Sequence, residues 1–211
     1  MGTTLLSAVE VIGRIPDAYF QAIGSGTGAI AVWENNLRLI EDGRWGSHKM
    51  RLYPSQNEPF TIMYDSWKLH SRQLVSMSPD DARKAAAEID AKVLSNRKPP
   101  YSLAGGLFDA MEDAGGDMFK ADNEELRYWK KRFAELEGID IHDAPAVAVA
   151  SLAQAVNEGV VKKDETIMLN ITGGGEELAK SEHEVFYAKP HLVLDPALPP
   201  EDIISAVKDL F

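Results

Sequence analysis

The chain has 211 residues, of which 45% are hydrophobic and 26% are charged, a composition typical of one soluble globular domain. Its 22 basic and 33 acidic residues give a formal net charge of −11, which would repel nucleic acid and anionic membranes, so we expect neither as a partner. There is no cysteine, which excludes disulfides, thiolate catalysis and thiolate metal sites, and no apolar run approaches the roughly 20 residues that span a bilayer, so we expect a cytoplasmic protein.

Helix-like and strand-like segments alternate along the chain. Leu5, Val9 and Ile12 are spaced to share one helix face, which predicts a helix over residues 4–15, before Pro16. The other expected elements are strands at 18–23, 50–53, 117–120 and 165–171, helices at 29–42, 79–94, 105–114, 122–137 and 145–158, and a last pair of elements at 191–194 and 200–210.

The clearest helix start is at Ser78, a capping residue that precedes Pro79 at the first helical position. We expect the Ala-rich helix that begins there to run to about Leu94. Because strands alternate with helices, the predicted fold class is α/β, an open and mostly parallel sheet with helices on both faces. We expect residues 1–211 to form a single domain.

The turn Gly24-Ser25-Gly26-Thr27-Gly28 follows the first expected strand and precedes a helix. A glycine-rich turn of this kind presents backbone N–H groups in front of the positive end of the helix dipole, which is the geometry that binds a phosphate group. We therefore expect a phosphorylated ligand there. The alternative is a glycine turn that binds nothing.

The spacing Gly24-x-Gly26-x-x-Ala29 also fits the loose fingerprint of dinucleotide-binding proteins. A dinucleotide site needs an acidic residue at the end of the next strand, where it accepts the ribose hydroxyls. The strand expected at 50–53 is followed by residues 54–57, which include no carboxylate. This absence disfavours a nicotinamide or flavin site.

A second glycine-rich turn, Thr172-Gly173-Gly174-Gly175, directly follows the apolar strand expected at 165–171. Ligands of open parallel sheets lie beyond the carboxyl ends of the strands, so the two turns would face the same crevice if their strands are neighbours. Three successive glycines indicate a close approach of the backbone to another group. The alternative is a flexible turn that leads into a helix.

The two turns, together with the residues around them, resemble a known family. Residues 20–31 and 169–175 resemble the pyridoxal-phosphate enzymes of the threonine synthase group, and within that group the cysteate synthases of methanogenic archaea. Residues 43–46, 55–60 and 99–102 extend the resemblance over most of the chain. It implies a fold that resembles part of the large domain of a fold-type II pyridoxal-phosphate enzyme.

The resemblance assigns pyridoxal 5′-phosphate as the cofactor and gives roles to both turns. By analogy with the family, Gly24, Ser25, Gly26, Thr27 and Gly28 hold the cofactor phosphate, and Thr172 forms a hydrogen bond with the pyridine nitrogen. A neutral hydroxyl, unlike Asp, does not stabilise a pyridinium, so the ring is a weaker electron sink. Such a site suits elimination and replacement at the substrate β- or γ-carbon more than transamination.

The resemblance also implies that part of the enzyme is missing from this chain. The family carries the lysine that forms a Schiff base with the cofactor, and the loop that binds the substrate carboxylate, in its N-terminal half. Neither element precedes Gly24 here, and Lys49, Lys68, Lys84 and Lys92 do not match the lysine motif. We therefore expect an incomplete large domain that corresponds to the C-terminal half of the enzyme, with no catalytic residue of its own and no metal ligands.

The implied activity of the complete enzyme is the replacement of the phosphate of O-phosphoserine by sulfite, which gives cysteate for coenzyme M biosynthesis. Its partners would be a small amino-acid substrate, the missing N-terminal half and further copies in a homo-oligomer, and we expect this chain to be inactive alone. Two alternatives remain open. One is threonine synthase, which forms threonine from O-phosphohomoserine, and the other is a non-catalytic module that binds a phosphorylated ligand.

Overall fold

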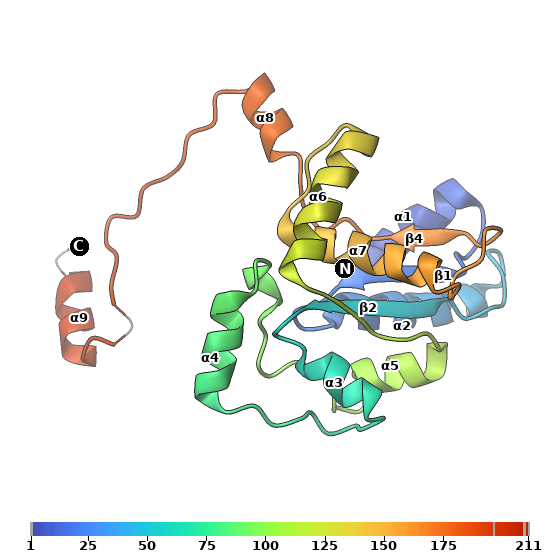
Figure 1. Cartoon of the computed structure of the whole chain (residues 1–211), viewed down its shortest axis with the longest axis horizontal. Helices are drawn as coiled ribbons and strands as arrows, with labels where there is room; N and C mark the ends of the chain where they lie inside the picture. The colour runs from blue at the N-terminus through green and yellow to red at the C-terminus, as the bar shows by residue number, and fades with distance from the viewer. Residues whose placement is uncertain (1, 196, 209, 211) are drawn as a thin grey trace. The chain divides into compact units, whose positions relative to one another are not determined.

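The computed structural model describes residues 2–195, 197–208 and 210. The chain divides into two units, residues 1–178 and residues 179–211, of which the first contains the sheet (Figure 1). None of the helices in the described residues is long and apolar enough to cross a membrane.

A four-stranded sheet lies at the centre of the first unit. Its strands are β1 (Ala18–Ala22), β2 (Arg51–Asn57), β3 (Phe119–Ala121) and β4 (Ile167–Leu169), in the spatial order β3-β2-β1-β4. All three pairings are parallel, which confirms the predicted fold class. The carboxyl ends of the four strands therefore lie along one edge of the sheet.

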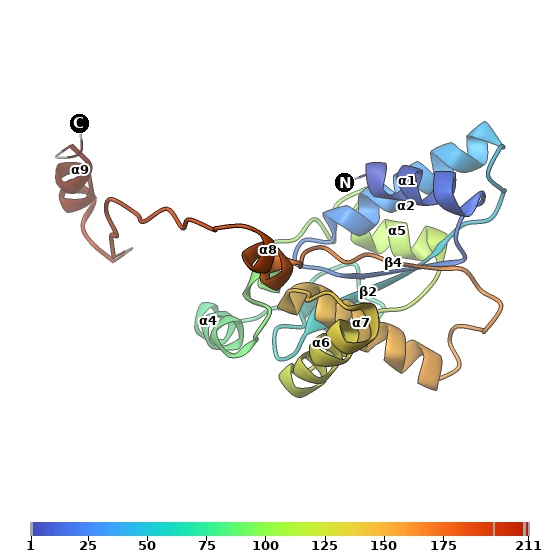
Figure 2. The same cartoon turned by 90° about the horizontal axis from the view of Figure 1, so that it is seen from above.

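Helices cover both faces of the sheet (Figure 2). On one side lie α1 (Thr3–Ile12), α2 (Thr27–Asp42) and α5 (Leu107–Ala114), and on the other lie α6 (Asn123–Glu137) and α7 (Asp143–Asn157). Side chains alternate along β1 as the pleat requires, with Tyr19 packed in the core of the α1–α2 side. Phe20 packs with Ala155 of α7 in the opposite core and stacks on Tyr53, with ring centroids 4.8 Å apart.

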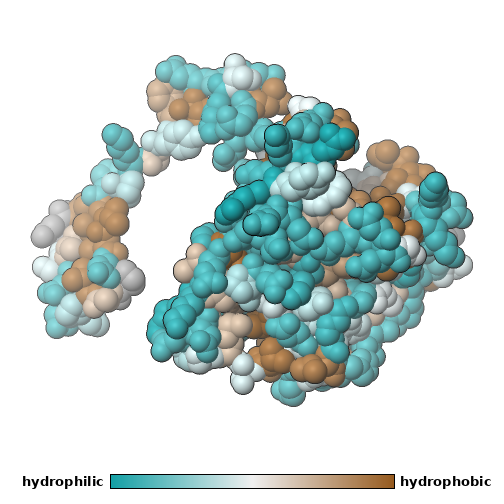
Figure 3. Space-filling view, viewed as in Figure 1, coloured by the Kyte–Doolittle hydropathy of each residue, from teal (hydrophilic) through white to brown (hydrophobic). Residues whose placement is uncertain are grey.

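The remaining elements are shorter. They are α3 (Ile62–Lys68), α4 (Pro79–Glu88), the 3₁₀ helix η1 (Lys92–Leu94), α8 (Glu176–Glu182) and, in the second unit, α9 (Pro200–Lys208). The second unit exposes apolar side chains, among them Phe186 (82%) and Val193 (81%), whereas much of the visible surface of the first unit is hydrophilic (Figure 3).

The helix expected at 79–94 begins as predicted, because the Ser78 side chain caps it by accepting the N–H of Asp81. It ends early, at Glu88. The N–H groups of Asp90 and Ala91 donate instead to Oδ1 of Asn123, at 2.9 Å, and of Asn57, at 3.0 Å. These distant side chains draw segment 90–98 away from the helical path.

Other boundaries also differ from expectation. α1 ends at Ile12 rather than at 15, because Gly13 adopts a left-handed conformation with φ of +80°. β2 continues to Asn57, and β4 is shorter than the predicted strand at 165–171. α3 was not predicted, and residues 191–194 form no strand.

Candidate functional site

The two glycine-rich turns follow neighbouring strands of the sheet. Phe20 of β1 pairs with Leu169 of β4, and the N–H of Asn170 donates to the carbonyl oxygen of Phe20 at 2.9 Å. The turn at 24–28 and the turn at 172–175 therefore both begin at the same edge of the sheet. The sequence predicted that the two turns face the same crevice if their strands are neighbours, and β1 and β4 are neighbours.

The turn at 24–28 opens directly into α2. Gly26 adopts a left-handed conformation, with φ of +78°, and stands at the N-cap of α2 without a side-chain cap. Among the described residues, the N–H groups of Gly28 and Ala29 have no hydrogen-bond partner. Such unpaired donors in the first turn of a helix are the groups that bind an anion.

Both outer glycines of this turn are tightly packed. A Cβ at Gly24 would lie 2.7 Å from the carbonyl oxygen of Val93, and a Cβ at Gly28 would lie 2.5 Å from Oε1 of Gln21. The turn is therefore held between segment 90–98 on one side and β1 on the other. At Gly24, where the neighbouring atom belongs to the backbone, only glycine allows this close approach.

A partly buried hydrogen-bond network, which the sequence did not predict, joins the ends of β1 and β4. Nδ2 of Asn170 donates to the Tyr19 hydroxyl at 2.8 Å, and that hydroxyl donates to Oε1 of Gln21 at 2.8 Å. Burial raises the pKa of Tyr19 to about 12, so the phenol stays protonated at neutral pH. No local pattern marks this network, because Asn170 lies 151 positions after Tyr19 in the chain.

The turn at 172–175 packs against residues 140–142. The N–H of Gly175 donates to the carbonyl of Asp140 at 2.8 Å, and the N–H of His142 donates to the carbonyl of Gly173 at 3.0 Å. A Cβ at Gly173 would lie 2.7 Å from Nδ1 of His142. The close backbone approach that the three glycines predict is therefore a contact with residues 140–142 of the same chain.

Asp140 also caps the helix that follows this turn. Its carboxylate accepts the N–H groups of Glu176 at 3.0 Å and Glu177 at 3.2 Å, at the start of α8. Burial favours the neutral acid, but these N–H bonds outweigh it and the pKa of Asp140 lies below its usual value. Thr172 is therefore not needed as the cap of α8.

Thr172 is exposed and lines a cavity of about 420 Å³ with Val93, His142 and Pro145. Val93 is also the residue that touches Gly24, so segment 90–98 adjoins both turns. Asn57, at the carboxyl end of β2, holds this segment through the N–H of Ala91. No sequence pattern predicted this third component of the site, because Asn57 and Ala91 meet only in the folded chain.

The residues at this edge suit an anionic cofactor with a phosphate group. The first turn of α2 contains no acidic residue, so no carboxylate there opposes the positive end of the helix dipole. Within the part of the chain that the structure describes, no group of three or more His, Asp or Glu residues could hold a metal ion. Unpaired backbone donors, rather than a metal, are the groups offered to an anion here.

Comparison with known proteins agrees with these features. The model of the family described as pyridoxal-phosphate dependent enzyme matches residues 1–173. Cysteate synthase of Methanosarcina acetivorans is 47% identical over 205 residues, which are 96% of this chain and 49% of that protein. Cysteate synthase of Methanocella paludicola is 45% identical over 210 residues, 99% of this chain and 49% of that protein. The chain thus spans about half the length of these curated relatives.

Solved structures share the fold at low sequence identity. Maize serine racemase matches with a TM-score of 0.59 and 14% identity, over 86% of this chain and 50% of that one. A processed threonine deaminase isoform of Solanum lycopersicum matches with a TM-score of 0.61 and 15% identity, over 86% of this chain and 46% of that one. These likenesses confirm the expected fold, that of fold-type II pyridoxal-phosphate enzymes. With the family model matching residues 1–173, the chain belongs to the pyridoxal-phosphate dependent enzymes.

Proposed function

We propose that the chain is the cofactor-binding part of a cysteate synthase, an enzyme that replaces the phosphate of O-phosphoserine with sulfite and releases cysteate and phosphate. The observation that carries the proposal is the 47% identity to a cysteate synthase over 96% of the chain. The relative positions of the two turns agree with it, because a cofactor there would reach both. This reading makes the chain an incomplete large domain of a cytoplasmic, homo-oligomeric enzyme.

The glycine turn is the proposed phosphate site. The N–H groups of Gly28 and Ala29 have no partner among the described residues and lie in the first turn of α2. With the backbone of Gly24, Ser25, Gly26 and Thr27 they would surround the phosphate oxygens. A dianionic phosphate is favoured there by the hydrogen bonds and by the helix dipole.

Thr172 is the proposed partner of the cofactor ring nitrogen. Bound pyridoxal phosphate supplies an electron sink for the bonds at the substrate α-carbon. The Thr172 hydroxyl carries no charge, so it would orient the ring without holding a proton on its nitrogen. Replacement at the β-carbon needs less charge delocalisation than transamination, which fits this neutral partner.

The other half of the enzyme would supply what this chain lacks. We propose that it contributes the lysine that binds the cofactor covalently and the loop that binds the substrate carboxylate. β3 and β4 are the outer strands of the described sheet, so each has one side open for pairing with a further strand. A second half could therefore extend the same sheet.

Complementation tests the proposal. The chain would be joined to the residues that precede the matching region in the Methanosarcina acetivorans relative, and supplied with pyridoxal phosphate, O-phosphoserine and sulfite. We expect the joined protein to form cysteate, detected by mass spectrometry, and the chain alone to form none. A second reaction would contain O-phosphohomoserine in place of O-phosphoserine and sulfite, and threonine formed there by a protein that makes no cysteate would contradict the proposed substrates.

Comparison of the isolated chain with the joined protein separates part of an enzyme from a stand-alone module. Borohydride reduction in the presence of pyridoxal phosphate should attach no stoichiometric cofactor to one lysine of this chain, whereas the joined protein should be labelled once. Full labelling of one lysine in the isolated chain, together with turnover, would show that it needs no second half.

A further inference from the structure

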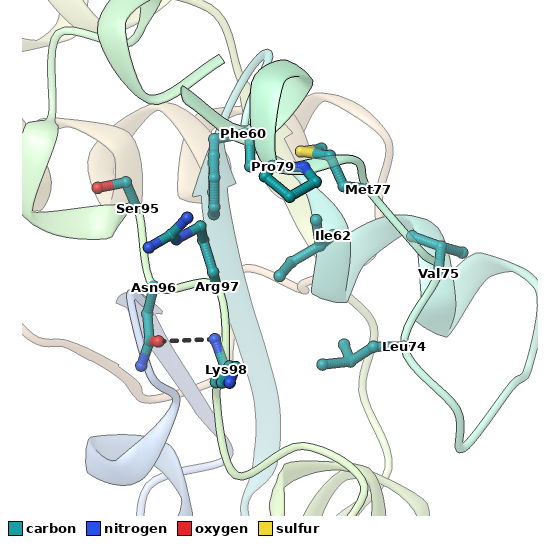
Figure 4. A pocket seen from close by; sticks show the side chains of 11 residues that line it. Phe60, Ile62, Leu74, Val75, Met77, Pro79, Ser95, Asn96, Arg97 and Lys98 are labelled. Atoms are coloured by element: carbon teal, nitrogen blue, oxygen red, sulfur yellow. Dashed lines mark hydrogen bonds between the residues drawn. The ribbon is translucent and has the colours of Figure 1, made fainter. Parts of the chain in front are cut away.

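A second cavity, of about 640 Å³, lies beyond the carboxyl end of β2 (Figure 4). Its volume falls in the range of about 300–1,000 Å³ that is usual for small-molecule sites. It shares no lining residue with the cavity at Thr172 or with the turn at 24–28. The site proposed above therefore does not account for it.

One wall of this cavity is apolar and is held in place. Phe60 and Ile62 are buried, and Leu74, Val75 and Met77 are half-buried beside them. The loop that carries the last three is fixed to α3, because the N–H of Val75 donates to Oγ of Ser66 at 2.9 Å. Figure 4 shows Ile62, Leu74 and Val75 on the side of the cavity opposite Lys98.

The other wall is cationic. Arg97 and Lys98 are exposed, and no acidic side chain lines the cavity. Asn96 fixes the turn that presents them, since its Oδ1 accepts the N–H of Lys98 at 2.9 Å (Figure 4). Two adjacent positively charged residues and an apolar wall thus line the same cavity.

The charges of Arg97 and Lys98 are not satisfied by the protein. Among the described residues, neither side chain forms an ion pair, whereas each of the other arginines pairs with a carboxylate. The chain has 33 acidic residues against 22 basic ones, so carboxylate partners are in excess. Two adjacent cations left unpaired in such a chain are available to an external anion.

We propose that this cavity binds a small organic anion, with its apolar body against Phe60, Leu74 and Val75 and its phosphate, sulfonate or carboxylate group at Arg97 and Lys98. A guanidinium matches such groups because its N–H donors form paired hydrogen bonds with their oxygens. The apolar wall requires a carbon body, which distinguishes the ligand from inorganic phosphate. This inference does not rest on the proposed cysteate synthase activity.

Calorimetric titration of the 211-residue chain with phenyl phosphate tests the inference. We expect phenyl phosphate to bind at least about tenfold more tightly than inorganic phosphate or benzyl alcohol. Inorganic phosphate lacks the apolar body, and benzyl alcohol lacks the anionic group. The double variant Arg97→Gln/Lys98→Gln should weaken binding of phenyl phosphate by about tenfold or more.

The matched control is Lys162→Gln/Lys163→Gln, which removes the same charge from two adjacent exposed lysines outside the cavity. It should leave the affinity within about twofold of that of the unchanged chain. Equal weakening by both double variants would mean that phenyl phosphate responds only to net charge and would overturn the proposal.

Methyl NMR locates the bound probe. With labelled methionine methyl groups, we expect phenyl phosphate to shift the signal of Met77, which lines the cavity, and to leave that of buried Met118 unchanged. Binding that leaves Met77 unshifted, for example at the glycine turn, would refute the assignment. Met77 reports on this cavity and not on the glycine turn. An unshifted Met77 signal therefore refutes the second site without bearing on the proposed synthase activity, which is tested by cysteate formation.

Discussion

The Tyr19 hydroxyl and the Asn170 amide are joined by a hydrogen bond of 2.8 Å between side chains 151 positions apart. The same hydroxyl donates to Oε1 of Gln21, and this oxygen would lie only 2.5 Å from a Cβ at Gly28. Two hydrogen bonds thus link Asn170, which leads to Thr172, with Gln21 of β1, and the Gln21 side chain packs against Gly28 at the start of α2. The two turns of the candidate site are positioned relative to each other by these contacts.

Tyr19→Phe should lower the free energy of unfolding and weaken pyridoxal phosphate binding together. Loss of the hydroxyl leaves the amide groups of Gln21 and Asn170 without this partner, at a cost of about 1–3 kcal/mol. Urea unfolding and a cofactor titration measure the two effects. The matched control is Tyr101→Phe, which removes the hydroxyl that donates to the carbonyl of Ser71, away from both turns. An equal loss of cofactor affinity in both variants would contradict a positioning role for Tyr19.

The raised pKa of Tyr19 predicts a loss of stability in alkaline solution. Its usual pKa of 10.0 applies to the unfolded chain and about 12 to the folded one, because burial disfavours the phenolate. The contribution is fully present below pH 10.0 and is lost as the pH rises towards about 12. Tyr19→Phe should therefore show a smaller decrease in stability over this range, measured by urea unfolding at several pH values. An unchanged pH dependence would place Tyr19 in contact with water.

Gly26→Asp should abolish or strongly weaken cofactor binding. It adds a negative charge to the turn at the N-terminus of α2, and its Cβ would also lie 2.9 Å from Cδ2 of Leu107, so the loss should exceed the roughly 1 kcal/mol of a dipole interaction. Gly26→Asn tests the charge alone, because Asn has a similar shape and tolerates the left-handed conformation. Gly43→Asp repeats the backbone strain alone at the other end of α2, where φ is also +78° and an added Cβ meets no neighbour. Equal affinity of the Asp and Asn variants for pyridoxal phosphate would show that the cofactor phosphate does not bind at this turn.

Thr172→Val separates a ring contact from a structural role. Because Asp140 already accepts the first N–H groups of α8, we expect the melting temperature to stay nearly constant. In the joined protein, cofactor affinity should fall and the absorption of the bound ring should shift. Asp140→Ala is the converse control and should lower stability by roughly 1 kcal/mol without altering the spectrum. A spectrum unaffected by Thr172→Val would exclude the contact with the ring nitrogen.

The local sequence was sufficient wherever a few neighbouring residues determine the structure. Ser78 and Pro79 predict a helix start because capping and a fixed φ act within one turn. The predicted end of the same helix was wrong by several residues, because the side chains of Asn123 and Asn57 accept the N–H groups of Asp90 and Ala91. Gln56 acts similarly, accepting the N–H groups at the start of the unexpected helix α3.

By itself the sequence determined the α/β class, the positions of both glycine turns and the family resemblance, because strand and helix periodicity and turn composition are local properties. Only the tertiary structure placed β4 beside β1, joined Tyr19 to Asn170, and brought Val93 against Gly24. It also brought Arg97 and Leu74 to the lining of one cavity. These relationships depend on hydrogen bonds and packing between residues far apart in the chain, and no pattern within a short window of sequence encodes them.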